Sequence, residues 1–296
     1  MKQQFTIQAV TDCTIEYRGT IDYSIDNGKT WKRLKKISIQ ATREAQFRNA
    51  KSEEDSRFFI EGKFNVYGHI STLAQYGTKA FRWMFRQTNV VDASKLVLDY
   101  DELWPKAYSY MFADCDNLIS APVLPATTLA DSCYEFMFTN CNSLAKAPKL
   151  PATTLADRCY YVMFSGCRSL TTAPELPAMK LAKYCYYSMF GACTALTTPP
   201  SVLPAMTLAE RCYQDMFYEC TSLTTAPKLP ATVLANRCYS YMFFYCRSLT
   251  TAPALPATKL EKRCYEYMFY DCVNIKELPI IPKQVLIDAM RMNFFS

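Results

Sequence analysis

The sequence predicts an α/β solenoid, a curved coil of about nine 26-residue units, preceded by a small all-β domain. The main support is the phrase C-Y-x-x-M-F-x-x-C, which recurs six times at nearly constant spacing. A fixed period of this length is typical of repeat proteins, in which each unit buries its apolar face only against its neighbours. The first cysteines of the phrase, 26 or 27 residues apart, are Cys133, Cys159, Cys185, Cys212, Cys238 and Cys264.

Each unit has two halves of different composition. In LADRCYYVMFSGC, residues 155–167, the apolar residues fit the i, i+3, i+4, i+7 spacing of a helix with one buried face. Thr153 or Thr154 occupies the expected N-cap position. The other half, SLTTAPELP at residues 169–177, predicts a brief strand and a tight turn. Residues 286–295 match the helical half once more, so we expect nine helical segments.

The alternation of strand and helix predicts a bend. Strands stack about 4.8 Å apart, whereas packed helices need about 8 to 10 Å. The coil should therefore curve with the strands on the inner side, which creates an extended concave surface.

Residues 1–72 predict the separate β domain. Runs such as FTIQAV, TIEYRG and KISIQA alternate apolar and polar residues between turn residues. Residues 24–31 match the S-x-D-x-G-x-T-W pattern called an Asp-box, in which Asn27 and Gly28 suit a tight hairpin. One copy does not make a propeller, which needs several blades. We expect the domain to cap the open N-terminal end of the coil.

Residues 73–296 resemble the BspA-like leucine-rich repeats of bacterial surface proteins. The phrases C-x-S-L-T-T-A-P-x-L-P-A-T-x-L-A and C-Y-x-x-M-F carry the resemblance, and they recur in register. The resemblance implies an open, curved coil used for binding and adhesion rather than catalysis. It also suggests a cell-surface location, or a virion fibre or receptor-binding component of a phage that infects such bacteria.

The fourteen cysteines allow three interpretations. Zinc sites favour close cysteine pairs with histidine nearby, but here the spacing is eight and the one histidine is His69. Disulfides require Cα atoms within about 7 Å, closer than packed helices would place the first cysteines. The second series lies nearer the turns, and its pairing stays open. The third interpretation is a small, buried apolar residue that stacks from unit to unit. The second series is Cys115, Cys141, Cys167, Cys193, Cys220, Cys246 and Cys272, and Cys13 belongs to neither.

Composition narrows the function classes. Lysine and arginine number 33 against 27 acidic residues, too even a balance to imply a nucleic-acid partner. No stretch reaches the roughly 20 apolar residues of a membrane span, and the N-terminal residues do not read as a secretory signal. A single histidine, seven glycines and no phosphate-binding loop argue against an enzyme. We expect no catalytic residue, cofactor or metal, and the location is left open between virion, cytoplasm and cell surface.

Candidate binding residues lie where the repeat varies. The positions of Arg158 and Ser165 should point away from the buried stripe of the helix. In three consecutive units these positions combine arginine with an aromatic residue, a pairing enriched where partners bind. The residues are Arg211, Tyr218, Arg237, Phe244, Tyr245, Arg263 and Tyr270. The competing inner surface would present Lys149, Thr171, Thr172, Glu175 and Lys228.

The leading hypothesis is a non-catalytic recognition or adhesion protein that binds a protein or a cell-surface glycan. In the virion setting, other virion proteins would also be partners. The alternative is a structural scaffold that contacts itself or a larger particle through residues 293–296. A glycosidase, suggested by the Asp-box alone, ranks third.

Overall fold

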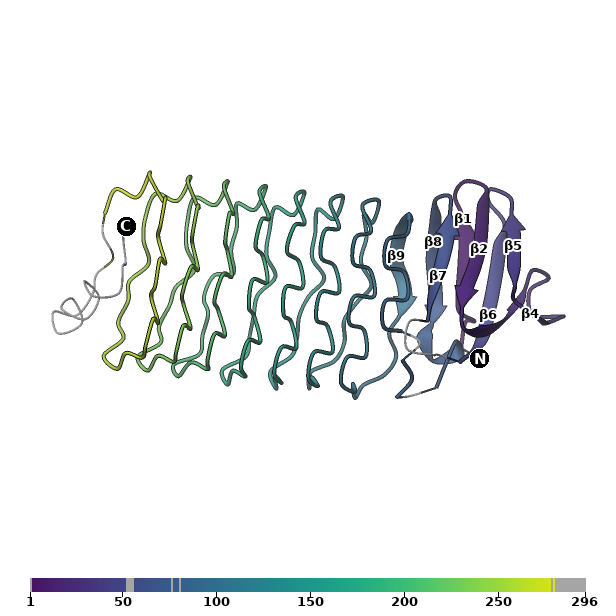
Figure 1. Cartoon of the computed structure of the whole chain (residues 1–296), viewed down its shortest axis with the longest axis horizontal. Helices are drawn as coiled ribbons and strands as arrows, with labels where there is room; N and C mark the ends of the chain where they lie inside the picture. The colour runs from purple at the N-terminus through teal and green to yellow at the C-terminus, as the bar shows by residue number, and fades with distance from the viewer. Residues whose placement is uncertain (1, 52–55, 76, 80, 278, 280–296) are drawn as a thin grey trace.

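The computed structural model describes residues 2–279, except 52–55, 76, 80 and 278. A β domain lies at one end, and the repeats follow as successive coils along one axis (Figure 1). We call each 26-residue unit a coil. The final half-unit expected at residues 286–295 lies outside the described residues.

Two sheets form the β domain and its junction with the first coil. The six-stranded sheet has the order β4-β3-β6-β1-β8-β9, and the three-stranded sheet has the order β5-β2-β7. All pairs are antiparallel except β8 with β9. The bounds are β1 (Thr6–Ala9), β2 (Cys13–Arg18), β3 (Thr20–Ser24), β4 (Lys32–Arg33), β5 (Lys36–Ile39), β6 (Glu44–Lys51), β7 (Arg57–Glu61), β8 (Phe64–His69) and β9 (Val90–Val97), with the 3-10 turn η1 (Ile70–Thr72) before β9.

The β domain continues into the coils on both sides of the core. Strand β9 of the first coil extends the six-stranded sheet by pairing with β8. On the other side, the amide of Phe58 in β7 donates to the carbonyl of Met84. The Phe58 ring stacks on Phe85 with centroids 5.6 Å apart. The domain therefore covers the end of the first coil; the exact boundary after residue 72 stays a prediction.

The Asp-box forms the predicted hairpin. Strands β3 and β4 pair antiparallel, and Asn27 and Gly28 both adopt positive φ angles. The Asp26 carboxylate accepts hydrogen bonds from the amide and hydroxyl of Thr30, which with the Ser24 hydroxyl lower its pKa. These bonds close the loop on itself, so the motif is structural here.

The expected helices are wrong: apart from η1, the described residues form no helix. The segment 155–167 and its equivalents form a run of overlapping β-turns, which we call the turn run. Alternate amides donate to the next coil, as from Tyr134 to the Cys159 carbonyl at 3.0 Å. The amides between them close local turns, as from Met137 to the Tyr134 carbonyl at 3.2 Å. The fold class is therefore an almost entirely β solenoid, not α/β.

The burial pattern explains the error. In one turn run the buried side chains larger than glycine are Cys159, Tyr160, Met163, Phe164 and Cys167, an alternation of two inward and two outward residues with a period of four. A helix turns by about 100° per residue, so such a pattern would rotate by about 40° every four residues and leave the buried face. Thr154, the expected N-cap, instead forms parallel bridges with its counterparts in both adjacent coils.

The backbone of the turn run requires left-handed residues. Every fourth residue has positive φ, for example 54° at Ser132, 55° at Phe136 and 57° at Asn140. Residues other than glycine avoid this region, at a cost of roughly 1–2 kcal/mol each. The hydrogen bonds between coils and the packing of the core offset that cost. Because these interactions join different units, the propensities of individual residues do not predict the left-handed conformation.

The predicted curvature is also wrong. Ring centroids in the buried phenylalanine column, from Phe85 to Phe269, lie 5.5–5.8 Å apart. Those in the tyrosine column, from Tyr108 to Tyr265, lie 5.7–5.9 Å apart. Without helices no side of the coil needs a wider spacing, so the coils run in a nearly straight row without a concave face (Figure 1).

The cysteines follow the third interpretation, because all fourteen are buried and free. Second-series thiols have a further role: each donates its S–H to the carbonyl of a phenylalanine in the preceding coil. Examples are Cys141 to Phe112 and Cys167 to Phe138, both at 3.1 Å. The thiols thus link coils as hydrogen-bond donors rather than as disulfides.

We expect the thiols to be unreactive in the folded protein. Burial raises the pKa of Cys167 to about 12, so almost no thiolate is present at neutral pH. Titration with a thiol reagent, without reductant, should detect few or none of the fourteen thiols in native protein and all of them in denaturant. Rapid reaction of the native protein, or a low count after denaturation, would contradict this arrangement.

Candidate recognition surface

The outer face of the turn run carries the predicted aromatic residues. Tyr218, Phe244 and Tyr270 belong to consecutive coils and stack in a column, with centroids 5.3 and 4.7 Å apart and planes within 11°. Tyr245 packs edge-on against Phe244 at 4.5 Å. All four are half-buried by one another, so the structure brings these predicted residues into one contact surface.

The predicted arginines form a parallel row with different partners. Arg211 lies over the Tyr184 ring at 5.4 Å, and Arg263 pairs with Glu266 at 3.4 Å. Arg237 lies between them in the chain, and its positive charge lowers the pKa of Asp215. The arginines therefore border the surface and do not lie over the aromatic column.

A second group of outer rings lies toward the β domain, outside the set of seven candidate binding residues. Tyr110 stacks on Phe136 at 4.5 Å, and Tyr161 stacks on Tyr187 at 4.7 Å. Arg158 lies over Tyr161 at 5.1 Å. A four-residue period would have found these rings, because they occupy the outward pairs of their coils.

Asp215 occupies a position that holds an aromatic ring in some coils and a smaller residue in others. Tyr110, Phe136, Val162, Ser188, Asp215 and Tyr241 occupy equivalent positions in consecutive coils. Burial raises the pKa of Asp215 from its usual value of 3.8 to about 6, against the opposing effect of hydrogen bonds from Tyr187 and Gln214 and the nearby charges of Arg211 and Arg237. Asp215 is therefore a poorly solvated carboxyl group among the outer rings, and Glu135, at 9% exposure, is another buried acid there.

Unpartnered polar atoms lie beside Asp215. They are Nε of Arg211, Oε1 of Gln214 and Oγ of Ser240. Gln214 is only 6% exposed and Ser240 is fully buried. A buried polar atom without a partner costs about 1–3 kcal/mol, and such atoms recur along the solenoid, as at Ser109 Oγ, which occupies the position equivalent to Ser240 Oγ.

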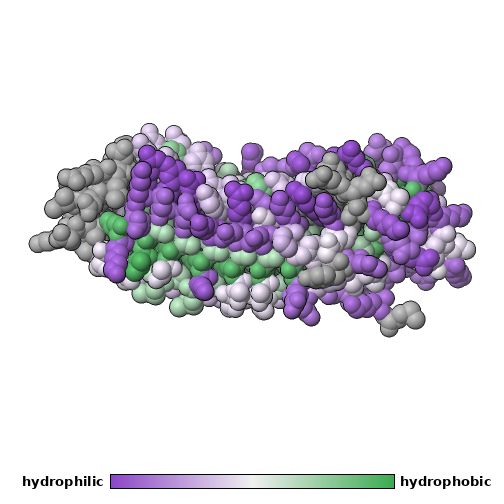
Figure 2. Space-filling model, turned by 60° about the horizontal axis from the view of Figure 1, so that its bottom comes forward, coloured by the Kyte–Doolittle hydropathy of each residue, from purple (hydrophilic) through white to green (hydrophobic). Residues whose placement is uncertain are grey.

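A second surface runs along the Thr-Ala-Pro segments. Two crevices of about 600 and 630 Å³ lie between neighbouring coils, lined by alanine, proline, leucine and threonine. Lys149, Thr171, Thr172 and Glu175 line the first, and Lys228 lines the second, all exposed. The inner-surface residues thus border shallow apolar crevices, not a concave face. Figure 2 shows an apolar band along the solenoid, with rows of hydrophilic residues along one side of it.

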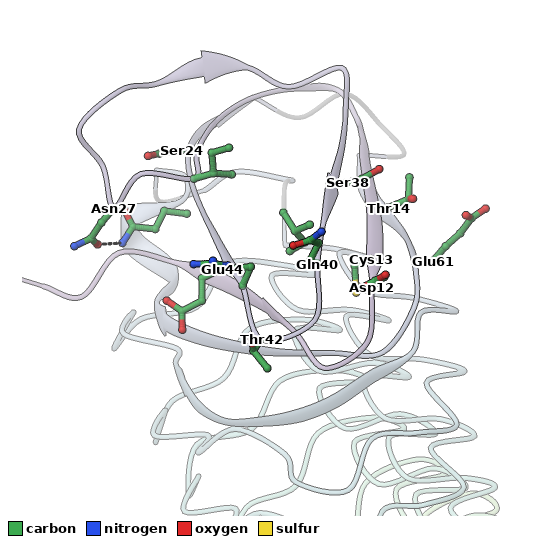
Figure 3. Close-up of a pocket in the computed structure, with 14 residues that line it drawn as sticks. Asp12, Cys13, Thr14, Ser24, Asn27, Ser38, Gln40, Thr42, Glu44 and Glu61 are labelled. Carbon is green, nitrogen blue, oxygen red and sulfur yellow. Dashed lines mark hydrogen bonds between the residues drawn. The ribbon is translucent and has the colours of Figure 1, made fainter.

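The β domain has an open pocket of about 1060 Å³ with a mainly polar lining. Glu44 and Glu61 lie on opposite sides of it, with Gln40 and Cys13 between them (Figure 3). Among the described residues, no three histidine, cysteine or acidic side chains come together as a metal site would require. In the same part of the chain, no helix has the length and apolarity to cross a bilayer.

His69 belongs to a structural network. Its Nδ1 lies 3.0 Å from Asp99 Oδ2, and Asp99 also accepts hydrogen bonds from Lys2 and Ser71. Burial raises the pKa of Asp99, but these bonds lower it more, so its pKa lies below the usual range. The arrangement fixes the chain between β8 and the first coil.

The comparison with family models decides the family. A model of the BspA type leucine rich repeat region matches residues 106–250 and 201–290 in six copies, more than half of the chain. The chain belongs to this family. BspA-type repeats are typically non-catalytic and serve protein interaction or adhesion, as the sequence interpretation expected. Comparison with curated proteins and with solved structures gives no significant match.

Proposed function

We propose that this BspA-type protein is a recognition protein that holds a cell surface or surface polymer against the outer face of its turn run. The observation that carries the proposal is the stacked column of Tyr218, Phe244 and Tyr270 beside a row of arginines. Aromatic and arginine side chains are enriched at binding sites, where they contribute most of the energy. Backbone hydrogen bonds fix the spacing of the coils, and the rings stack on one another at that spacing. The rings therefore lose little conformational freedom when a partner binds.

The setting of this function is part of the proposal. A phage fibre or receptor-binding component would use such a surface against a bacterial cell, as would a bacterial surface protein. Neighbouring genes for capsid and tail proteins would favour the first setting, and genes for outer-membrane proteins the second. The scaffold alternative relied on residues 293–296, which lie outside the described residues.

We expect simultaneous replacement of Tyr218, Phe244 and Tyr270 by alanine to reduce binding to intact bacterial cells at least tenfold. The reason is the loss of three adjacent aromatic rings, each worth roughly 1 kcal/mol or more at an interface. Pull-down of labelled protein with a panel of cells measures this, and circular dichroism monitors folding.

A matched triple variant on the second surface, Lys149, Thr172 and Lys228 to alanine, serves as control and should bind normally. If the aromatic variant folds and binds like the unmodified chain, the outer face is not the binding surface. If the control variant alone loses binding, the apolar crevices take its place.

A further inference from the structure

The Thr-Ala-Pro segments of successive coils form a surface with apolar walls, on which both crevices lie. We call it the crevice face. Alanine and proline side chains line it, and Figure 2 shows the apolar band that runs along the solenoid. Val123, which is 68% exposed, extends the face by one coil, because it occupies the position equivalent to Lys149. Contiguous exposed apolar patches of this kind mark interaction surfaces.

The shape of the crevice face restricts the partner. Parallel bridges join Lys146 to Thr172 and Thr172 to Thr198, and later coils are joined in the same way. The face therefore keeps one strand spacing, about 4.8 Å, along a nearly straight row of coils (Figure 1). A straight surface of constant repeat fits another surface of the same repeat over its whole length. A second copy of this chain meets that condition.

The size of the crevice face suits a stable pair. Six coils, from that of Val123 to that of Ala254, extend about 29 Å along the axis at about 4.8 Å per coil. Across the face, Thr171 to Pro177 of one crevice extend up to about 23 Å at about 3.3 Å per residue. The product, about 700 Å² per copy, approaches the roughly 800 Å² per partner of a standard stable interface.

The charges on the face select an antiparallel arrangement. Lys149, Glu175 and Lys228 are exposed and occupy equivalent positions, and Ser201 belongs to the coil between the last two. A two-fold axis at the Ser201 coil, across the rod and in the plane of contact, places Glu175 of each copy opposite Lys228 of the other. We propose that a second copy of this chain docks on the crevice face in this antiparallel arrangement, with two such ion pairs flanking the axis.

Other antiparallel registers bring like charges together or leave charges without a partner. An axis at the coil of Glu175 or of Lys228 would place that side chain opposite its own counterpart. An axis half a coil nearer the N-terminus would oppose Lys149 to Lys228, and one half a coil nearer the C-terminus would oppose Glu175 to Ala254. Like charges across an interface disfavour association. The axis at Ser201 instead opposes Lys149 to Ala254, and it brings the two crevices of different copies together.

This inference goes beyond the proposed function and is independent of it. Tyr218, Phe244 and Tyr270 belong to the turn run and line neither crevice. A single copy can therefore bind a cell through its outer face whether or not it pairs. Failure of the pairing would leave the recognition role intact, and failure of cell binding would leave the pairing intact.

Sedimentation velocity of the full chain at micromolar concentrations tests the pairing by charge reversal. We expect a dimer. Glu175→Lys and Lys228→Glu should each weaken it at least tenfold, because each opposes like charges on both sides of the axis. The double variant should restore the dimer to within about threefold. In one chain the two positions lie two coils apart, about 10 Å, so this rescue reports contact between copies. Glu175 also accepts hydrogen bonds from Ser201, so circular dichroism checks that each variant folds.

Lys262→Glu is the matched control for charge reversal. Lys262 is exposed and lies at the position that holds Asp157 and Glu210 in other coils, so an acid fits there. It does not line either crevice. This variant should form the dimer as the unmodified chain does.

Cross-linking tests the position of the axis. Thr198→Cys places a thiol on the axis coil, opposite its own counterpart, and mild oxidation should give a covalent dimer. Thr251→Cys, also at an exposed bridge position but two coils away, should not, because it lies opposite Lys146. The native thiols are buried, so they do not contribute.

Three results would overturn the proposal. One is a monomer at every concentration, which would leave the crevice face to a different partner. Another is a double variant that dimerises no better than the single variants. The third is equal cross-linking of Thr198→Cys and Thr251→Cys, as a parallel pair would give.

Discussion

Phe164→Ala should lower the free energy of unfolding by about 3–5 kcal/mol, the usual cost of deleting a buried aromatic ring. Phe164 is fully buried in the middle of the phenylalanine column. It stacks on Phe138 and Phe190 with centroids 5.5 and 5.8 Å apart and planes within 6°. Neighbouring coils are held at one spacing by their backbone bonds and cannot collapse into the space. Urea unfolding followed by circular dichroism measures the change.

Phe244→Ala is the matched control, because Phe244 is also stacked on both sides but lies on the outer face. Its replacement should cost only about 1 kcal/mol, the range of an aromatic pair beyond simple burial. Equal losses for the two variants would show that the outer column stabilises the coil as much as the inner one does. The outer rings would then be structural, and the proposed binding role would lose its main support.

Asp215→Asn should raise the stability at pH 8 by about 2 kcal/mol. Ionising a buried carboxyl is unfavourable, as the pKa of about 6 indicates. The difference from the usual value of 3.8, at about 1.4 kcal/mol per pKa unit, sets an upper limit of about 3 kcal/mol. Partial exposure reduces it to about 2 kcal/mol. Asparagine keeps the shape of the side chain and carries no charge to desolvate.

The pH dependence gives the sign of this effect. Below about pH 4 the carboxyl is protonated in both the folded and the unfolded chain, so the variant gains nothing from the missing charge. Between about pH 4 and 6 the unfolded chain ionises first, and the stability of the unmodified protein falls relative to the variant. Above about pH 6 the full difference is present. Chemical unfolding of both proteins from pH 4 to 8 tests this, and a difference that does not change with pH would contradict it.

The repeat length, the family and the stacked core could all be predicted from the sequence, because a regular spacing of Cys, Tyr, Met and Phe survives any change of backbone conformation. The local conformation could not. Over a single turn, two buried residues followed by two outward ones fit a helix as well as they fit the turn run. The two conformations differ only over a longer stretch, because in a helix the side chains from Cys159 to Cys167 would gradually rotate away from one face. Left-handed residues such as Val162, with φ of 55°, run against local propensity and are set by the bonds between coils.

The outward position of some candidate residues could be predicted for the same reason. Tyr218, Phe244 and Tyr270 are seven residues beyond their arginines, and they face outward in a turn run as they would in a helix. The helical period, however, gave no reason to single out Tyr187 or Asp215. The setting of Asp215 among outer rings can be recognised only when neighbouring coils are aligned, because its equivalents Ser188 and Tyr241 lie about one repeat away in the sequence.

The hydrogen bonds between coils have a consequence for how such chains change in length. Each coil presents the same donors and acceptors to its successor, so a whole unit can be added or lost without altering the joints that remain. Even the 27-residue interval between Cys193 and Cys220 is absorbed locally, where Ser201 bonds to Glu175 of the preceding coil. Unequal recombination between near-identical units would therefore yield folded rods of different reach. Each event would also delete, duplicate or move rings on the outer face, so ligand preference can diverge while the core stays the same.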